Sequence, residues 1–457
     1  MTQISTKPPS GMRDFLPEEA ARRKRIFSLV EEVYESYGFE PLETPSLERL
    51  TTLLGKYGEE GDKLLFKVLK RGEKFERAIA EDNPTEQDVA DHGLRYDLTV
   101  PLARVVAQYQ HDLPRFFKRY QIAPVWRADR PQHGRYREFY QCDVDIVGSR
   151  SMAVENDVCA AVSEVLQRLG FGDFRIHINH RRLLAAIMQK VGIPEEKQDG
   201  VLISIDKLDK VGRNEVMEEL EQERGISRDV IDELLPLLGA LPGADTDNTA
   251  TIERLRGEVG DLEDGAAALD DLTDILTLGA DGPASDHFVV DPYLARGLAY
   301  YTGPIFEIRG EGFPGSIGAG GRYDELIGMF TKQDFPACGF SLGLERILVV
   351  MEERGMFDEE PARTDVLVTV WNTEFMPKSI ELAKELRDAG FRVDLYPSDT
   401  DRYGKQFGYA DRRDIPVVAL LAPDEVEGGT VTLKDMKSGD QESVNRTEVV
   451  EWLKKTL

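Results

Sequence analysis

One segment of the sequence specifies a long β-hairpin and carries a charge opposite to that of the whole chain. The flanks RYQIAPVWR (residues 119–127) and YREFYQCDVDIV (residues 136–147) are rich in β-branched and aromatic residues, and the polar loop ADRPQHGR joins them. Between Arg115 and Arg137, seven basic side chains and one acidic side chain give a net charge of +6, whereas the chain has a net charge of -27. This local reversal of charge favours a specific anionic ligand over nonspecific attraction.

Arginine clusters suit phosphate and carboxylate groups, because the planar guanidinium forms paired hydrogen bonds and stays charged. Two further arginines, Arg296 in ARGLAYYTG and Arg346 in GLERI, follow predicted strands, and the glycine-rich turn GAGGRYDEL carries Tyr323. Taken singly, these features also suit an exposed hairpin, surface arginines and a core tyrosine. The chain has no GxxxxGK[ST] P-loop, so a bound nucleotide would not lie in a P-loop, and a nucleotide held by arginines is one alternative.

The second half of the hairpin turns acidic. Side chains alternate along a strand, so Gln141, Asp143 and Asp145 are predicted to share one face. The hairpin is therefore expected to bind an anion at its loop, and its acidic second strand suggests a cation there.

The composition is that of a globular protein with several domains. The 457 residues, 41% of them hydrophobic, exceed what one core accommodates. The acidic excess argues against nonspecific binding of nucleic acid through a basic surface, and it would suit solubility at high salt. We recognise neither a membrane-spanning run nor a signal peptide, so we expect a cytoplasmic protein with no membrane segment. The three cysteines lack CxxC or CxxH spacing, and no motif of metal ligands is present.

Changes in composition and in the predicted secondary structure divide the chain into three domains, the first of which is split. Residues 1–190 alternate strand-like and helical segments, residues 191–286 are acidic and helical, and strand character returns in residues 287–358. After Pro361, βα units repeat over residues 364–457. We therefore predict a first domain interrupted by a helical insertion and followed by a compact α/β domain.

Six segments follow one another in order along almost the whole chain. They are PSGMRDFLP, RYDLTVPLAR, RADRPQHGRYREFYQCDVDIVG, RGLAYYTG, GAGGRYDEL and GFSLGLERI. Together they resemble the motifs of histidyl-tRNA synthetases, a family of class II aminoacyl-tRNA synthetases. The resemblance implies an α+β protein with an antiparallel-sheet catalytic domain, a helical insertion and a C-terminal α/β anticodon-binding domain. The implied reaction joins L-histidine to tRNA(His) through a histidyl-adenylate made from ATP, with release of AMP and diphosphate.

The resemblance also implies roles for particular residues. Arg127 and Arg296 would be catalytic at the α-phosphate, Arg296 in a place where other class II enzymes use a metal. Arg127, Arg135 and Arg346 would bind ATP, with magnesium on the outer phosphates. The α-amino group of histidine would be held by Asp97, Thr99 and Gln141, and the imidazole by Asp145 and Tyr301. The remaining residues implied in histidine binding are Arg296, Tyr300 and Tyr323, and those implied in approaching ATP or the tRNA acceptor end are Gln132, His133 and Arg135.

Three more expectations rest on the resemblance. Ala299 replaces the Asp expected in RGLDYY, which puts one supporting contact in doubt. The forms RYDLTVP and QCDVDI resemble the archaeal and eukaryotic branch, and with the acidic composition they suggest a salt-loving archaeon. The segment FEPLETPSLE, with Pro45, matches the family's dimer interface, so we expect a homodimer.

Two alternatives share the same catalytic fold. The noncatalytic regulatory subunit of ATP phosphoribosyltransferase typically lacks the C-terminal domain, and an adenylating ligase that acts on a small amine without tRNA does not need one. Residues 364–457 and the arginines at positions 127, 296 and 346 favour the synthetase. Histidine-dependent exchange of pyrophosphate into ATP, followed by charging of tRNA, discriminates among the three.

Overall fold

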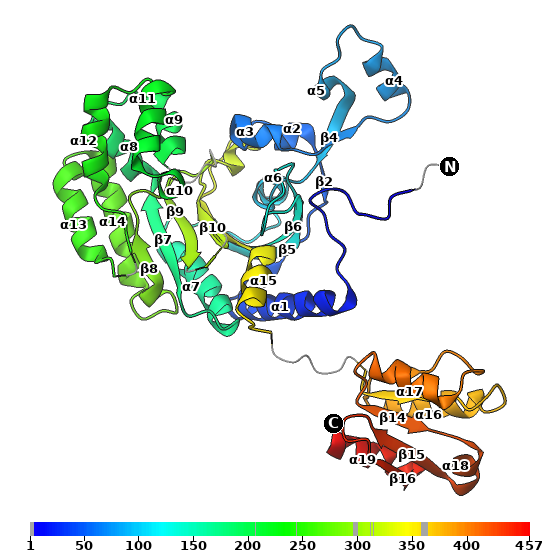
Figure 1. The fold of residues 1–457 in the computed structure, drawn as a ribbon. Helices are drawn as coiled ribbons and strands as arrows, with labels where there is room; N and C mark the ends of the chain where they lie inside the picture. Colours follow the sequence, from blue (N-terminus) through cyan, green and yellow to red (C-terminus); the bar gives the residue numbers. More distant parts are fainter. Residues whose placement is uncertain are drawn as a thin grey trace. The chain divides into compact units, whose positions relative to one another are not determined.

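The computed structural model describes residues 4–205, 207–243, 245–295, 300–310, 312–313, 315–357 and 364–457. The chain divides into two units, Met1–Met356 and Phe357–Leu457. Helices and strands are mixed in both units, and the predicted α+β class is confirmed (Figure 1). Within the described residues, no helix is both long and apolar enough to cross a membrane.

The centre of the first unit is an eight-stranded sheet. Its strands are β1 (Glu40–Pro41), β5 (Phe117–Trp126), β6 (Glu138–Val147), β7 (Phe174–His180), β8 (Phe288–Val290), β9 (Pro304–Gly310), β10 (Gly318–Arg322) and β11 (Ala337–Gly343). Their order in the sheet is β1-β5-β6-β11-β10-β9-β7-β8. The pairings from β5 to β7 are antiparallel, as predicted, whereas β1 with β5 and β7 with β8 pair in parallel at the two edges.

Strands β5 and β6 form the predicted hairpin, and their register decides which side chains face each other. Arg119 pairs with Asp145 across the hairpin. On the other side of β6, Gly339 of β11 lies opposite Asp145. Gln141, Asp143 and Asp145 occupy alternate positions of β6 and are all buried, so the hairpin places three polar side chains on one face of the central sheet.

Helices α1 (Pro17–Ser36) and α7 (Ala153–Arg168) pack against the sheet (Figure 1). α1 contacts β5, and α7 contacts β6 and β11. The apolar residues of α1 recur at helical spacing, so Ile26, Val30 and Val33 are buried. The other α-helices of the first unit, apart from those between residues 191 and 286, are α2 (Leu50–Leu53), α3 (Gly58–Lys63), α4 (Glu73–Ile79), α5 (Glu86–Val89), α6 (Thr99–Tyr109), α8 (Arg181–Lys190) and α15 (Leu344–Glu353).

Between β7 and β8 the chain forms α8 and then a helical segment. Its helices are α9 (Glu195–Ile205), α10 (Leu208–Val211), α11 (Arg213–Gln222), α12 (Arg228–Leu238), α13 (Asn248–Val259) and α14 (Glu263–Leu278). Because β7 and β8 pair, the chain leaves the sheet and returns to it at neighbouring strands. Nε2 of His180, at the end of β7, lies 3.1 Å from Oδ2 of Asp271 on α14 and ties the segment to the sheet. The domain boundaries at residues 190 and 286 stay predictions.

A small sheet leads the chain into helix α6. Its strands β2 (Leu47–Arg49), β3 (Lys67–Leu69) and β4 (Ala90–Leu94) have the order β2-β4-β3. The motif RYDLTVP follows β4, and Oδ1 of Asp97 accepts a hydrogen bond of 3.0 Å from the backbone N–H of Val100. This bond satisfies a free donor in the first turn of α6 and holds Asp97 at the start of the helix.

The second unit is an α/β domain on one five-stranded sheet. Its strands and helices are β12 (Val366–Val368), α16 (Met376–Asp388), β13 (Val393–Leu395), α17 (Tyr403–Asp411), β14 (Val417–Leu420), α18 (Pro423–Gly428), β15 (Thr430–Asp435), β16 (Gln441–Asn445) and α19 (Val449–Thr456). β12, β13 and β14 pair in parallel and belong to the predicted βα units, whereas β15 and β16 add an antiparallel pair that was not predicted. Val366 and Val417 are buried on one face and Leu367 and Val418 on the other, so the sheet has a core on both sides.

A buried ion pair fixes α7 to β10. Nε of Arg322 donates to Oε1 of Glu155 at 2.6 Å, and Nη2 donates to Oε2 at 2.8 Å. Both side chains are buried. Burial raises the pKa of Glu155, and the bonds from Arg322 act in the opposite direction. Glu155 therefore depends on Arg322 for its counter-charge, whereas Arg322 also has Asp324, whose Oδ1 lies 3.1 Å from its Nη1.

Glu155→Ala is expected to destabilise the first unit by about 3–5 kcal/mol, because the buried Arg322 guanidinium would lose both bonds to Glu155 and, of its ion pairs with the described residues, would keep just the contact of Nη1 with Asp324 at 3.1 Å. Urea denaturation followed by circular dichroism measures the loss. The matched control is Glu73→Ala, which removes an exposed pair with Arg77 on α4, where the charged atoms are 3.2 Å apart, and which should change stability little. Equal effects of the two substitutions would contradict the assignment.

Candidate active site

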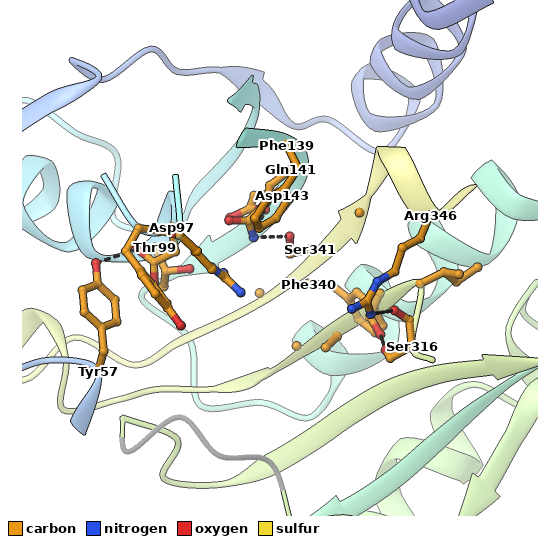
Figure 2. Close-up of a pocket in the computed structure, with 18 of the residues that line it drawn as sticks. Tyr57, Asp97, Thr99, Phe139, Gln141, Asp143, Ser316, Phe340, Ser341 and Arg346 are labelled. Atoms are coloured by element: carbon orange, nitrogen blue, oxygen red, sulfur yellow. Dashed lines mark hydrogen bonds between the residues drawn. The ribbon is translucent and has the colours of Figure 1, made fainter. Parts of the chain in front are cut away.

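A cavity of about 420 Å³ lies over the middle of the eight-stranded sheet. Residues of β6, β10 and β11, the hairpin loop, and the segments before α6 and β9 line it (Figure 2). Ten of the residues predicted from the sequence line this one cavity. They are Asp97, Thr99, Arg127, Arg135, Gln141, Asp145, Tyr300, Tyr301, Tyr323 and Arg346.

Asp145, predicted to bind an imidazole, is buried and held by two neighbours. The Tyr323 hydroxyl donates a hydrogen bond to Oδ1, and Nη2 of Arg119 lies 2.8 Å from Oδ2. Burial raises the pKa of Asp145, whereas the Arg119 charge and the Tyr323 hydroxyl oppose this shift. Among the described residues, Oδ2 has the charge contact but no hydrogen bond, so it can accept one from a ligand N–H.

Room for this carboxylate depends on a glycine in the neighbouring strand. A Cβ placed at Gly339 of β11 would lie 1.9 Å from Oδ1 of Asp145. Any side chain there would displace the carboxylate from the cavity. Gly339, the glycine of ACGFS, therefore leaves the space that the Asp145 carboxylate occupies.

Arg119 is a buried cation beside the site and is not among the residues predicted from the sequence. It has no solvent exposure, and its Nη2 donates to the carbonyl of Leu98 at 3.2 Å. Its charge lowers the pKa of both Asp143 and Asp145. The register of the hairpin, with Arg119 opposite Asp145, is the signal that identifies it. That register follows from the geometry of the loop, which the composition of ADRPQHGR does not specify.

Asp97 forms a second buried acidic group in the cavity. Its Oδ1 accepts a hydrogen bond of 3.1 Å from the Tyr57 hydroxyl (Figure 2). Its Oδ2 accepts one of 3.4 Å from the Tyr300 hydroxyl. Burial raises the pKa of Asp97, and the bond from Val100 and the charge of Arg127 oppose the shift. Tyr57 lies in none of the six motifs, which is why it was not predicted.

Gln141 has a buried acceptor that none of the described residues uses. Its Nε2 donates to Oγ of Ser341 at 2.6 Å and to Oδ1 of Asp143 at 3.4 Å (Figure 2). Its Oε1 is buried and has no hydrogen-bond partner. Buried polar atoms are rarely left unpaired, so a ligand donor is expected at this atom.

Asp143 lies between Gln141 and Asp145 on the same face of β6. Burial raises its pKa to about 7; the Arg119 charge and the Ser341 hydroxyl lower it, and the Asp145 charge raises it further. Neither Asp143 nor Ser341 was assigned to the site from the sequence. Alternation along β6 already placed Asp143 on the right face, whereas Ser341 has no signal of its own.

Arg127 enters the cavity where the hairpin loop begins. Its Nε donates to the carbonyl of Tyr96 at 3.0 Å. Its guanidinium carbon lies 4.3 Å from the centre of the Tyr96 ring and 5.1 Å from that of Phe139. The described contacts thus hold Arg127 through Nε and its flat faces, which suits a guanidinium whose terminal nitrogens bind a ligand.

Two more arginines approach the cavity from the loop and from α15. Nη2 of Arg135 lies 2.9 Å from Oδ1 of Asp129, while 45% of the Arg135 side chain is exposed. Arg346 donates from Nη1 to the carbonyl of Ser316 (Figure 2) and from Nε to that of Gly134 at 3.3 Å. Arg346 therefore joins the hairpin loop to the segment that leads into β10.

Three predicted residues are not brought into the cavity. Gln132 and His133 do not line it; they lie at the exposed tip of the hairpin, where Gln132 and Arg135 exchange backbone hydrogen bonds of 3.1 and 2.9 Å. Their contact with ATP or the tRNA acceptor end stays a prediction. Arg296 lies outside the described residues, as does Ala299.

Known proteins resemble this chain along its whole length. The family model for histidyl-tRNA synthetase matches residues 11–347. The chain belongs to the histidyl-tRNA synthetase family. A model of the anticodon binding domain matches residues 365–456 in the second unit.

Individual members of the family agree with this assignment. The histidine–tRNA ligase of Porphyromonas gingivalis is 42% identical over 442 residues, which cover 95% of this chain and 96% of that protein. The histidine–tRNA ligase of Gloeobacter violaceus is 41% identical and covers 95% of each chain. The crystal structure of histidyl-tRNA synthetase from Nostoc sp. PCC 7120 has a TM-score of 0.80 and 30% identity, with full coverage of both chains.

These relatives are bacterial, so the predicted archaeal and eukaryotic branch of the family is wrong. The inference depended on two short forms, RYDLTVP and QCDVDI. Both segments contribute residues to the cavity lining. Identity of about 40% over nearly the whole chain outweighs these two short forms.

Asp143 is expected to make the stability of the first unit fall as pH rises. Its carboxyl has a pKa of about 7 when folded, against a usual pKa of 3.8. The folded state holds this proton more tightly, so the stabilisation is complete below about pH 4 and is lost as pH rises through about pH 7. Asp143→Asn should flatten this slope, measured by urea denaturation at about pH 5 and pH 8.

The control is Asp112→Asn, which removes an exposed carboxylate after α6 and should leave the slope unchanged. Arg119 and Asp145 face Asp143 and remain in both variants. A slope of wild-type size in Asp143→Asn would show that another group titrates.

Proposed function

We propose that this cavity is the site of a histidine–tRNA ligase, with histidine held by its acidic and amide groups and ATP by its arginines. The chain attaches L-histidine to tRNA(His) through an adenylate. One observation carries the assignment of the cavity: buried hydrogen-bond acceptors and arginines line the same space. An ammonium and an imidazole offer donors to the first set, and a polyphosphate offers acceptors to the second.

The histidine half is proposed to lie over β6. The α-ammonium has three N–H donors, and Asp97, Thr99 and the unpaired Oε1 of Gln141 offer acceptors to them. The imidazole N–H would donate to Asp145, with Tyr301 beside it. An amino acid without such a donor would leave Oδ2 of Asp145 buried and without a hydrogen bond from the described residues, which disfavours its binding.

The ATP half is proposed to lie under the hairpin loop. In the first step a carboxylate oxygen of histidine attacks the α-phosphorus, the bond to the β-phosphate oxygen breaks, and diphosphate leaves. Negative charge grows on the α-phosphate, and fixed cations in a site with little water stabilise it. Arg127 is proposed at the α-phosphate, Arg346 at the γ-phosphate, and Arg296 beside the reacting carboxylate.

Magnesium is proposed to arrive with ATP, bound by the phosphate oxygens. The described residues contain no cluster of three or more ligands that could hold a metal ion. Glu345, next to Arg346, is already engaged: Oε1 pairs with Nη1 of Arg23 at 2.8 Å, and Oε2 accepts from the N–H of Tyr140 at 2.8 Å. The described residues therefore offer no site in which protein ligands alone would hold magnesium, which suits an ion that keeps phosphate oxygens and water as ligands.

tRNA is proposed to contact two regions. The exposed hairpin tip, with Gln132, His133 and Arg135, would approach the acceptor end, where a terminal ribose hydroxyl attacks the adenylate carbonyl and AMP leaves. Residues 364–457 would bind the anticodon, which the match to an anticodon binding domain supports. A homodimer formed through the segment around Pro45 belongs to the same proposal. The proposed divisions of the first unit are 1–190 and 287–358 for the catalytic domain and 191–286 for the insertion.

Purified protein is expected to exchange labelled pyrophosphate into ATP only when histidine is present, and then to charge tRNA(His). Exchange tests the adenylate step, and charging tests the transfer step. No exchange would reject the ligase assignment and favour a regulatory relative. Exchange without charging would favour an adenylating ligase that does not use tRNA.

Arg296→Ala should lower the rate of adenylate formation about 100-fold or more while ATP binding stays measurable, because this arginine is assigned to the charge that develops in the transition state. Single-turnover adenylate formation and ATP titration separate the two effects. Arg228→Ala, on α12 of the helical insertion, serves as the control. Near-normal turnover in Arg296→Ala would remove Arg296 from the site.

A further inference from the structure

The motif PSGMRDFLP has no role in the proposed chemistry, yet part of it contacts the hairpin loop. Residues 10–15, here called the brace segment, lie outside the cavity lining. The backbone N–H of Arg137 donates to the carbonyl of Gly11 at 2.7 Å. Nη1 of Arg137 donates to the carbonyl of Ser10 at 3.4 Å. The brace segment is therefore fastened to the point where the loop meets β6.

Arg137 connects the brace segment to Arg127 and Arg135, the two arginines of the hairpin that line the cavity. Its carbonyl accepts from the N–H of Arg127 at 2.9 Å, which closes the base of the loop. Its Nε donates to the carbonyl of Asp129 at 3.0 Å. The Asp129 carboxylate in turn holds Arg135 at 2.9 Å. A shift of Arg137 would thus move Arg127 and Arg135 together.

The turn in the brace segment leaves no space for a side chain at Gly11. The N–H of Met12 donates to the carbonyl of Pro9 at 3.0 Å, and Gly11 has a φ of 82°, as the third residue of a type II turn requires. A Cβ at Gly11 would lie 2.8 Å from Cγ of Arg137 and 2.9 Å from Cγ of Pro131. Both atoms belong to the hairpin loop or its end, so the glycine permits the close approach of the two segments.

A stack of rings and guanidinium groups extends the same contact. The guanidinium of Arg13 lies 3.9 Å from the centre of the Tyr136 ring and 4.9 Å from that of Phe15. Arg23 of α1 lies 3.9 Å from the Phe15 ring and 5.0 Å from the Tyr140 ring. The stack therefore connects the loop, the brace segment, α1 and β6 through contacts that favour a fixed geometry.

We propose that the brace segment is a positioning element for the hairpin loop, which holds Arg127 and Arg135 in the geometry that ATP and the acceptor end require. The inference rests on the proposed function. None of the contacts described for the segment reaches Asp97, Gln141 or Asp145. Disturbing it should therefore weaken the use of ATP and tRNA more than the binding of histidine.

Gly11→Ala is expected to raise the KM for ATP in pyrophosphate exchange about tenfold and to slow tRNA charging, with the KM for histidine within about twofold of wild type. The matched control is Gly38→Ala after α1, where φ is 77° but nothing lies within 4 Å of an added Cβ. It carries the same backbone strain without the contact, and its KM values should stay at wild type. Equal rises in both KM values for Gly11→Ala, or equal behaviour of the two variants, would overturn the proposal.

Arg13 offers a second test that does not depend on backbone strain. It is exposed, so Arg13→Ala should fold, and it is expected to raise the KM for ATP in the same direction as Gly11→Ala. Arg13→Lys keeps a cation over the Tyr136 ring and should lie between Arg13→Ala and wild type. Folded Arg13→Ala with a wild-type KM for ATP would overturn the proposal.

A measurement without catalysis separates this proposal from the ligase assignment. Amide hydrogen exchange of residues 128–136 should be faster in Gly11→Ala than in wild type and unchanged in Gly38→Ala. Unchanged hydrogen exchange in Gly11→Ala would overturn the proposed role of the brace segment, even if the wild-type protein is an active ligase. An inactive wild-type protein would reject the ligase assignment. The hydrogen-exchange result would still decide whether the brace segment orders the hairpin loop.

Discussion

The pairing of β6 with β11 is the contact on which the site depends. It joins strands about 200 positions apart in the chain and places Ser341 beside Gln141 and Gly339 beside Asp145. Backbone hydrogen bonds fix the spacing between strands, so these side chains meet at distances that no local structure could set. The helical segment is inserted between β7 and β8, away from this pairing, which lets it lengthen the chain without entering the register of the site.

Burial and charge have opposite effects on the carboxyl groups in the part of the cavity proposed to hold histidine. Burial raises the pKa of each of the three carboxyl groups, Asp97, Asp143 and Asp145. Arg119 is the buried cation that faces two of them. A ligand ammonium would supply a further positive charge where acceptors find no donor among the described residues. The binding of such a ligand completes an incomplete set of buried interactions, which explains how a small polar molecule can be selected in a site with little water.

The period of side chains along a strand and the order of the motifs were enough to predict part of the site. The period of two along β6 predicted a shared face for Gln141 and Asp145, and ordered motifs predicted residues that one cavity brings together. The roles of Arg119 and Ser341 could not be predicted in this way, because they depend on the register between strands from separate segments. Strands β15 and β16 were missed for a similar reason: single short runs carry weak signals until they pair.

The way in which the loop arginines are held explains how an acidic chain can present a cationic site. Arg127 donates to the carbonyl of Tyr96, and Arg137 donates to the carbonyls of Asp129 and Ser10. A carbonyl orients a guanidinium without cancelling its charge, whereas a carboxylate would neutralise it. Arg135 has a carboxylate partner, but its side chain is nearly half exposed, so water weakens the pair and a phosphate can compete for it. The positive charge therefore stays available at the loop, although the whole chain has a net charge of -27.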